Sequence, residues 1–227
     1  MAVSRHHIRS TITRMASELH AAPIDDALLQ SIYECDQGLY PAPLPFERMQ
    51  AWRDACPELS ILCRTAGPGS RDVGAIIVMP LLKRHWEELL VGKQKEIEIQ
   101  PGMFASARDD EGAEVGMHVF HVERFEGCED VRGLAKLALR LVQNVVDDKP
   151  WKIVGYSALT ASDSGRAVFQ RLGYESTGYE EFFVKKGDGK FEMLCFGPQE
   201  EKPSAATAEL EIESRSLMVA RHGSVGF

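Results

Sequence analysis

The sequence predicts an α/β fold in which a mixed and partly splayed central sheet is flanked by helices. Apolar runs of strand length recur along the chain, and segments with a helical spacing of apolar residues separate them. A strand, a glycine-bearing turn, a long helix and a second strand follow one another over residues 116–158. This order is typical of a βαβ unit with a right-handed crossover, whose strands are parallel or splayed neighbours.

The chain up to residue 197 divides into short elements. The expected helices cover residues 25–39, 46–55, 83–91, 131–148 and 162–172. The expected strands cover residues 7–13, 59–64, 73–80, 95–100, 116–125, 151–158, 175–186 and 190–196. We expect one domain over residues 1–197. Residues 198–227, rich in Glu, Pro, Ser, Ala and Thr, are expected to form a tail with room for one added strand near 210–219.

In the first half of the chain, helix-capping residues, prolines and glycines mark where the predicted elements begin and end. Asp25 or Asp26 can cap the first helix, and the prolines of residues 40–45 end it, because proline lacks the N–H that a helix needs. The loop at residues 67–69, Gly-Pro-Gly, joins the first two long strands into a hairpin. Gly92 ends the next helix, since glycine readily takes the left-handed conformation found there.

Alternation of apolar and polar residues predicts the next strands. In residues 95–100, Glu96 and Glu98 alternate with isoleucines, so a strand would place both carboxylates on one face. Residues 105–113 are charged and glycine-containing, and we expect an exposed loop. Residues 116–125 form a strong strand pattern in which odd-numbered and even-numbered residues occupy opposite faces.

The second half of the chain also contains clear signals for where its elements lie and end. The long helix carries a buried stripe of Leu134, Leu137, Leu141 and Val145. Ser162 can cap the last helix and Gly173 can end it. The sequence Gly-Asp-Gly at residues 187–189 indicates a final hairpin.

Composition narrows the functional class. The chain of 227 residues carries a net charge of −8, which gives no general attraction to nucleic acid or anionic membranes. Its five cysteines are widely spaced without a Cys-x-x-Cys pair, so we expect free thiols and no metal site. No apolar run reaches the roughly 18 residues of a transmembrane helix. We expect a cytoplasmic protein, with a mitochondrial presequence in the first 17 residues, which contain arginines and no acid, as the alternative.

Residues 151–174, WKIVGYSALTASDSGRAVFQRLGY, carry a family resemblance. This strand–turn–helix unit resembles the C-terminal half of the GNAT superfamily, the acyl-CoA-dependent N-acyltransferases, whose pattern is close to Asn-x-x-Ala-x-x-Phe-Tyr-x-x-x-Gly-Phe. Ala167, Gly173 and Tyr174 are assigned to the pattern, and Ser164 to its Asn position. Phe169 stands where many members have a tyrosine that protonates the departing thiolate. The resemblance implies a GNAT-like fold.

The turn before the long helix resembles a second family pattern, Gln/Arg-x-x-Gly-x-Gly/Ala, which wraps the pyrophosphate of the acyl donor. Gly133 and Ala135 match it, whereas Asp130, beside Glu129, occupies the Gln/Arg position. Backbone N–H groups at a helix start donate to phosphate oxygens, and the helix dipole adds to the attraction. The resemblance implies that the residues binding acetyl-CoA are Val122, Glu123, Arg124, Arg132, Gly133, Leu134, Ala135, Ser164 and Phe169.

The same resemblance implies catalytic residues, for which we take Glu123, His121 and Ser164 as candidates. An amine must lose a proton to attack a thioester, so a carboxylate or a neutral histidine can serve as base. Other base candidates are Glu96 and Glu98; other hydroxyls near the leaving thiolate are those of Tyr156 and Ser162. On a regular strand, His118 and His121 face opposite sides, so their spacing does not predict a metal site.

The expected function is transfer of an acetyl or other acyl group from acyl-CoA to a primary amine by direct attack. The alternative is a GNAT-like module that binds CoA or a partner with little or no turnover, which Phe169 and the acidic pair at residues 129 and 130 favour. The expected partners are a small-molecule or peptide amine, with no nucleic acid and no membrane, and a homodimer stays open. A metal is not expected.

Overall fold

The computed structural model describes residues 19–37, 44–106, 111–187, 190–202 and 211–223. The strand expected at residues 7–13 and the alternative presequence lie outside the described residues. Within the described part, no helix is both long and apolar enough to cross a membrane.

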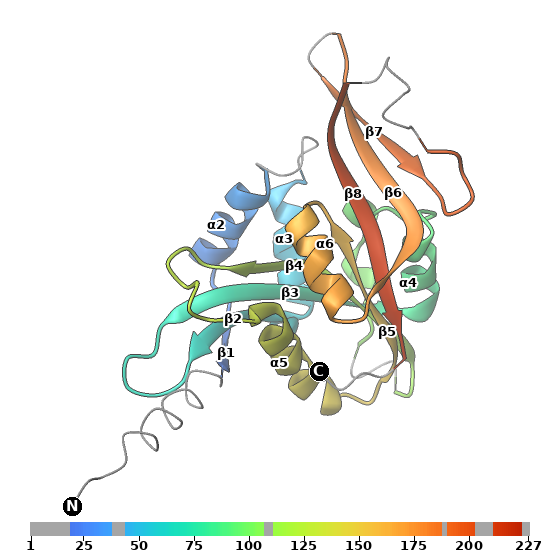
Figure 1. Ribbon diagram of the computed structural model, residues 1–227. Helices are drawn as coiled ribbons and strands as arrows, with labels where there is room; N and C mark the ends of the chain where they lie inside the picture. Colours follow the sequence, from blue (N-terminus) through green and yellow to red (C-terminus); the bar gives the residue numbers. More distant parts are fainter. Residues whose placement is uncertain (1–18, 38–43, 107–110, 188–189, 203–210, 224–227) are drawn as a thin grey trace, which may run out of the picture.

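A mixed sheet of eight strands forms the centre of the molecule, as the sequence predicted (Figure 1). Its spatial order is β1-β2-β3-β4-β5-β8-β6-β7. The strands span Leu19–Pro23 (β1), Ser60–Thr65 (β2), Asp72–Leu82 (β3), Glu114–Arg124 (β4), Lys152–Thr160 (β5), Glu175–Lys185 (β6), Phe191–Phe196 (β7) and Glu211–His222 (β8). Every neighbouring pair is antiparallel except β4 and β5, which run parallel and are joined by a helix.

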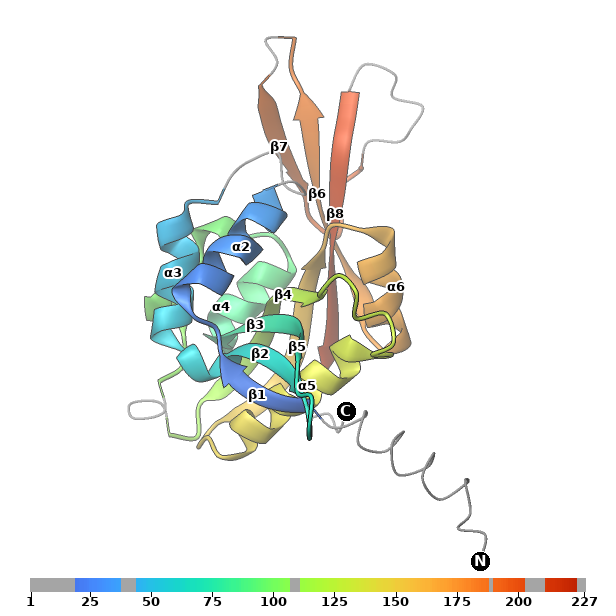
Figure 2. The same cartoon turned by 90° about the vertical axis from the view of Figure 1, so that its left-hand side faces the viewer.

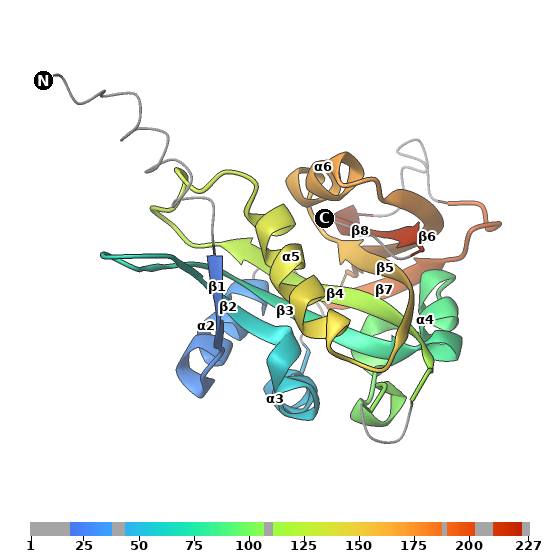
Figure 3. The same ribbon diagram turned by 90° about the horizontal axis from the view of Figure 1, so that it is seen from below.

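Helices cover both faces of the sheet. Figures 2 and 3 show α2 (Asp26–Gln37), α3 (Phe46–Ala55) and α4 (Lys83–Leu90) on one side, and α5 (Leu134–Asp147) and α6 (Asp163–Arg171) on the other. Three short 3₁₀ turns, Pro57–Leu59 (η1), Glu96–Glu98 (η2) and Pro101–Met103 (η3), connect elements on the first side. All five helices lie where the sequence predicted them, with bounds within a few residues of those expected.

Local signals explain where the helices begin and end. Asp25 Oδ1 accepts a hydrogen bond of 2.8 Å from the backbone N–H of Leu28 at the start of α2. Ser162 Oγ accepts one of 3.1 Å from the N–H of Gly165 at the start of α6. Gly173, with φ of 83°, ends α6 in the left-handed conformation that glycine adopts without strain.

The side chain of Trp86 fixes α4 against the middle of the sheet. Gly116 and Gly155 are paired neighbours on β4 and β5. A Cβ on Gly116 would lie 2.0 Å from Trp86 Cγ, and one on Gly155 would lie 2.6 Å from Trp86 Cη2. The two glycines therefore leave the space that the indole fills, and Trp86 is 1% exposed.

Two sequence expectations differ from the structure. Residues 95–100 form no strand but the 3₁₀ turn η2, so Glu96 is buried and Glu98 is exposed, and their carboxylates do not share a strand face. Side chains of α3 hold this turn: Trp52 Nε1 donates to the carbonyl of Ile99 at 2.9 Å. These tertiary bonds outweigh the short alternating pattern.

The C-terminal segment contains the added strand for which the sequence left room near residues 210–219. β8 (Glu211–His222) ends three residues beyond the expected 210–219 range and pairs with both β5 and β6. A boundary at residue 197 therefore does not separate β8 from the sheet. The segment at residues 105–113 is described only in part, and there Ala105 is buried rather than exposed.

Candidate active site

β4 and β5 part in the middle of the sheet and leave a hollow between them. Their paired register ends at Val119 and Ala158, while β4 continues to Arg124 and β5 to Thr160. This central hollow is lined by residues 119–123 of β4, residues 158–162 at the end of β5, and Phe169 of α6, with Asp36 of α2 at one side. Among the described residues, no strand pairs with the backbone of β4 beyond Val119 on its β5 side.

A β-bulge at Phe120 reorients the β4 side chains at this hollow. Val119 pairs with Val78 and His121 pairs with Ile77, so Phe120 is an extra residue. His118 pairs with Met79, which is two residues from Ile77 and therefore on the same face of β3. Consequently His118 and His121 lie on one face of the sheet, and the expectation of opposite faces is wrong. The extra residue changes the alternation that the argument assumed.

The two histidines still hold different partners. His121 lies between Asp36 and Glu123, whereas His118 lies between Glu96 and Ser157. Among the described residues, no group of three or more His, Cys, Asp or Glu side chains is arranged to hold a metal ion.

A groove runs between α5 and α6 next to the central hollow. Seven of the residues that the resemblance implied for acetyl-CoA line it, namely Val122, Arg124, Gly133, Leu134, Ala135, Ser164 and Phe169. Lys136 and Arg171 also line it, so three cationic side chains, with Arg124, face one space. Glu123 lies in the central hollow instead, and Arg132 is exposed and lines neither.

The start of α5 supplies hydrogen-bond donors to this α5–α6 groove. Gly133 precedes the helix with φ of 69° and ψ of 30°. The first backbone N–H groups of any α-helix have no partner within the helix, and here Leu134, Ala135 and Lys136 belong to that first turn. Together with the positive end of the helix dipole they make a site that suits an anion.

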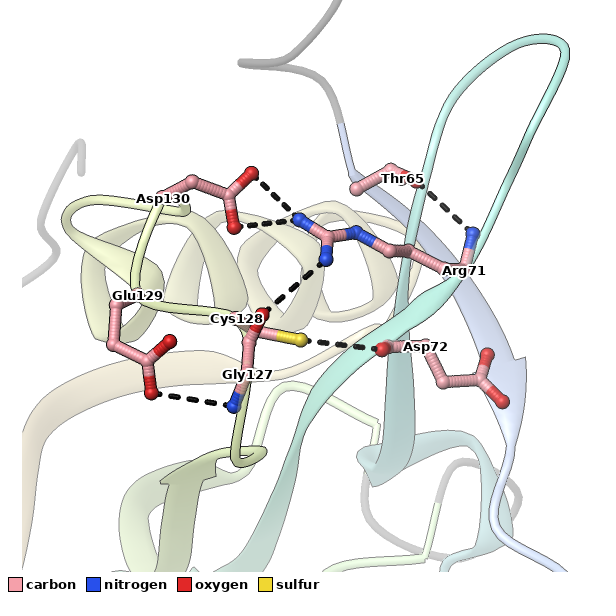
Figure 4. Close-up of polar contacts among 7 residues, drawn as sticks. All are labelled: Thr65, Arg71, Asp72, Gly127, Cys128, Glu129 and Asp130. Atoms are coloured by element: carbon pink, nitrogen blue, oxygen red, sulfur yellow. Dashed lines mark hydrogen bonds and ion pairs between the residues drawn. The ribbon is translucent and has the colours of Figure 1, made fainter.

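One of the two acidic residues in the preceding turn is paired with a cation (Figure 4). Arg71 Nη2 lies 2.6 Å from both carboxylate oxygens of Asp130, and this ion pair lowers the pKa of Asp130. Glu129 Oε1 accepts a hydrogen bond of 3.2 Å from the N–H of Gly127. The Asp130 charge is thus balanced by a cation from the β2–β3 hairpin, which the sequence pattern alone did not reveal.

The helix motif needs one correction. Ser162, which caps α6, lines both the groove and the central hollow, whereas Ser164 is exposed and lines the groove only. Counted back from Gly173, the family's Asn position also falls on Ser162. Ser164 lies 3.2 Å from Ser162, Oγ to Oγ, and so supports the cap rather than the hollow. The Tyr156 hydroxyl donates to Gln143 of α5 at 2.8 Å and lies away from the hollow.

Phe169 separates the groove from the central hollow. It is 4% exposed, lines both spaces, and its ring contacts that of Tyr174 edge-to-face with centroids 4.9 Å apart. This aromatic pair gives the site a rigid apolar wall and no hydroxyl at the Phe169 position.

His121 lies in the central hollow between two carboxylates, those of Asp36 and Glu123. Its Nδ1 lies 3.1 Å from both oxygens of Asp36, and its Nε2 lies 3.4 Å from Glu123 Oε1. Burial alone lowers the pKa of an imidazole, but the hydrogen bonds and charges of Asp36 and Glu123 outweigh it and raise the pKa of His121 to about 9. The ring is therefore an imidazolium at neutral pH, and its buried Nε2 makes no well-formed hydrogen bond.

An acidic pocket opens on the other side of the hollow, between α2, α3, η2 and the β6–β7 hairpin. Its polar lining consists of three carboxylates, those of Asp36, Glu96 and Glu181, from three separate elements. Its remaining walls are apolar or aromatic: Tyr33, Leu44, Met49, Trp52, Ile97, Phe120, Phe183 and Met193. Burial raises the pKa of Glu181 to about 7, and the charge of Glu96 adds to the shift.

A chain of buried hydrogen bonds ends at one of these carboxylates. Trp86 Nε1 donates to Ser157 Oγ at 2.8 Å, Ser157 Oγ lies 2.8 Å from His118 Nδ1, and His118 Nε2 lies 2.7 Å from Glu96 Oε1. Burial lowers the pKa of His118 to about 3, so His118 is neutral despite its acidic neighbour. Ser157 is fully buried and cannot reach a substrate, so the Ser–His–Glu order is not a nucleophilic triad.

The three spaces adjoin one another. The α5–α6 groove and the central hollow share Val122, Ser162, Gly165 and Phe169, and the hollow and the acidic pocket share Asp36 and Phe120. An anion-binding helix start, a gap with exposed backbone, and an acidic, apolar-walled pocket therefore follow one another across the sheet.

Comparisons with known proteins give similarity in fold. No family model and no curated protein matches the sequence. Arabidopsis thaliana NAA60 in complex with a bisubstrate analogue is 12% identical over 91% of this chain and 99% of that chain, with a TM-score of 0.49. Ard1 from Thermoplasma volcanium is 10% identical over 91% and 99%, with a TM-score of 0.47. The ribosomal-protein-S18-alanine N-acetyltransferase from Escherichia coli is 9% identical over 92% and 96%, with a TM-score of 0.41.

At this distance the likeness concerns the fold alone, and no residue role is taken from it.

Sequence reasoning missed several residues that line the site. Asp36 and Glu181 lie on α2 and β6, far apart in sequence, and carry no motif. Lys136 and Arg171 lie on exposed helix surfaces of a kind that charged residues usually occupy, so no pattern in the sequence distinguishes them. For Lys136, the one available hint is its position three residues after Gly133, in the first turn of α5.

Proposed function

We propose that this protein is an N-acyltransferase that moves an acyl group, most simply acetyl, from acyl-CoA to a primary amine by direct attack. The placement of these three spaces side by side carries the proposal. The α5–α6 groove fits the anionic end of the donor, the central hollow fits the thioester, and the acidic pocket fits a cationic amine. The GNAT-like motifs lie in the segments that build the groove.

The donor fits the residues present. Its phosphates would lie at the first turn of α5, close to Arg124, Lys136 and Arg171, where Asp130 is neutralised by Arg71. Its pantetheine would lie along β4 at residues 122–124, where the strand has lost its β5 partner and offers backbone N–H and C=O groups. A backbone N–H beyond the Phe120 bulge would polarise the thioester carbonyl.

We propose that His121 acts as a proton donor, whereas the sequence analysis named it as a candidate base. An imidazolium cannot accept a proton, but its Nε2–H can donate one to the departing thiolate. Glu123 and Asp36 hold the ring and keep it charged, so they act through His121. The His121 imidazolium would thus supply the proton that a tyrosine hydroxyl at position 169 could have donated. Ser164, on the groove side, is assigned to donor binding rather than to proton transfer.

The acceptor is proposed to be a primary amine on a compact apolar or aromatic body, either a small molecule or the end of a peptide. The walls of the acidic pocket bury apolar surface, while its carboxylates favour one cationic group. Acceptors with several charges would leave charges against apolar walls, which costs binding free energy.

A titration followed by an amine screen tests the function. Acetyl-CoA should raise the midpoint of thermal unfolding in a saturable manner that adenosine does not reproduce, because a ligand that binds only the folded state stabilises it. Release of free CoA thiol should then be faster with 2-phenylethylamine or hexylamine than with spermidine. No stabilisation by acetyl-CoA would reject the proposal.

A second candidate function, binding of acyl-CoA without turnover, is favoured by the absence of a hydroxyl at Phe169. Saturable binding of acetyl-CoA without thiol release for any amine in a broad panel would select this candidate over the enzyme.

A further inference from the structure

The carboxylate of Glu96 is rigidly held at the wall of the acidic pocket. Glu96 is 5% exposed and lies on the short turn η2. Arg48 Nη1 donates to the carbonyls of Ile97 at 3.2 Å and Ile99 at 3.0 Å, and Trp52 Nε1 donates to the latter. Three hydrogen bonds from α3 thus fix a turn that would otherwise be free to move, and with it the position of the carboxylate.

The buried chain that ends at Glu96 has a direction. Trp86 Nε1 is a donor only, so Ser157 Oγ must accept from it. The hydroxyl proton of Ser157 is then available to His118 Nδ1, which lies 2.8 Å away. We assign the single proton of neutral His118 to Nε2, which lies 2.7 Å from Glu96 Oε1 and would then donate to it. In this arrangement every group from Trp86 to His118 donates towards Glu96, and Glu96 is an acceptor.

The surroundings of Glu96 favour proton transfer from a bound ammonium group. The titratable groups around it are His118 on β4, Asp36 on α2, Glu181 on β6 and its chain neighbour Lys95. Burial raises the pKa of Glu96 well above its ordinary range, and the charge of Asp36 adds to this. The same burial lowers the pKa of an amine that enters the pocket, so the neutral amine and the protonated carboxyl become the favoured pair.

We propose that Glu96 is the catalytic base of the reaction, and that His118, Ser157 and Trp86 are positioning residues that hold its carboxylate ready to accept the amine proton. This inference rests on the proposed function and names the residue that activates its acceptor.

The proton balance is simple. The ammonium group gives one proton to Glu96, and the neutral nitrogen attacks the thioester carbonyl. The C–N bond forms and the C–S bond breaks. The nitrogen loses its second proton to solvent water as the amide forms, and the thiolate receives one from His121. After product release Glu96 gives its proton to solvent and His121 takes one back. One proton in total is released to solvent for each amide formed.

The other carboxylates of the pocket are less suited to this role. Asp36 is engaged by the His121 imidazolium through both of its oxygens. Glu181 Oε1 accepts from the Tyr179 hydroxyl at 2.7 Å, and within the described residues its interaction with His118 is one of charge without a hydrogen bond. Glu181 is therefore the matched control: it is a second buried glutamate in the same pocket, with a different hydrogen-bond partner.

The first experiment compares Glu96→Gln with Glu181→Gln, using acetyl-CoA and 2-phenylethylamine. Gln at position 96 still accepts from His118, so the fold is kept, but it cannot accept a proton. We expect kcat/KM of Glu96→Gln to fall about 100-fold or more at neutral pH, and the defect to shrink as pH rises and more of the amine is neutral. Glu181→Gln removes a charge that binds the amine, so KM for the amine should rise while kcat falls far less than in Glu96→Gln.

A parallel pH dependence in Glu96→Gln and wild type would overturn the proposal while leaving the proposed function intact. If the wild type shows no turnover and no binding of acetyl-CoA, both fall together.

The second measurement needs no turnover. Nitrogen NMR of ¹⁵N-histidine protein reports which ring nitrogen of His118 carries the proton, with Ser157→Ala used to assign the signal by its shift at Nδ1. We expect a neutral ring protonated on Nε2 from acid to alkaline pH. A ring protonated on Nδ1 would mean that Glu96 donates its own proton to His118, and this would refute the base assignment.

Discussion

Replacing Gly133 with alanine separates backbone strain from ligand binding at the start of α5. Gly133 has φ of 69°, a left-handed conformation that costs a residue with a Cβ about 1–2 kcal/mol. A Cβ there would meet no atom within 4 Å, so strain alone sets the cost in the free protein. In a chain of 227 residues, a destabilisation of this size lowers the unfolding midpoint by roughly 2–8 °C.

The effect on acetyl-CoA binding should exceed the effect on stability. Gly133 lines the α5–α6 groove, so the added methyl group would protrude into space proposed for the phosphates. Loss of one hydrogen bond to a charged group costs about 1.5–3 kcal/mol, which weakens binding roughly 10- to 150-fold. Titration calorimetry with acetyl-CoA measures this loss, and differential scanning calorimetry measures the strain.

Gly127→Ala is the matched control. Gly127 lies in the same turn between β4 and α5, has φ of 76°, has no atom within 4 Å of a built Cβ, and does not line the groove. Its alanine variant should lose the same stability and keep its affinity. If the two variants lose stability alike and bind acetyl-CoA equally well, the phosphate assignment at Gly133 is refuted.

Three further changes test the site and the sheet. Arg71→Ala frees the Asp130 carboxylate and should weaken acetyl-CoA binding roughly two- to tenfold by calorimetry; adding Asp130→Ala should restore it, and failure to do so would contradict the charge argument. His121 has a folded-state pKa of about 9 against an ordinary 6.5, so its stabilisation is complete below about pH 6.5 and up to about 3 kcal/mol is lost as pH rises to 9. Asp36→Asn should flatten that loss in urea unfolding curves, and an unchanged slope would count against the ion pair. Gly116→Ala places a Cβ 2.0 Å from Trp86 Cγ and should cost about 1–3 kcal/mol with a change in tryptophan fluorescence; wild-type stability would show that the indole is not fixed there.

The helices could be read from the sequence because their signals are local. Asp25, the prolines before α3, Gly92 and Ser162 each act through bonds within a few residues, and the bounds of α3 agree with the expected 46–55. The turn at residues 95–100 could not be read in this way. Its conformation depends on Arg48 and Trp52, which lie almost fifty residues earlier in the chain.

The site was predictable only where it coincides with a motif. Gly133 and its neighbours carry a spacing that points to an anion, but the partner of Asp130 comes from a separate hairpin. The bulge at Phe120 adds one residue to β4, and no sequence pattern indicates it. Because of this extra residue, His118 and His121 lie on the same face of the sheet and not on opposite faces as expected. The carboxylates of the acidic pocket come from α2, η2 and β6, so only the folded sheet brings them together.

The place of β8 has a consequence for how the protein is made. The ribosome translates β6 and β7 before β8, yet β8 lies between β5 and β6. Until β8 emerges, the nascent chain holds two unpaired strand edges that face the same empty position, one on β5 and one on β6. Such edges pair readily with other chains, so newly made protein passes through a stage that is prone to aggregation and suited to chaperone binding. The β5 edge also supports α6, so the groove can take its final form only after this last pairing.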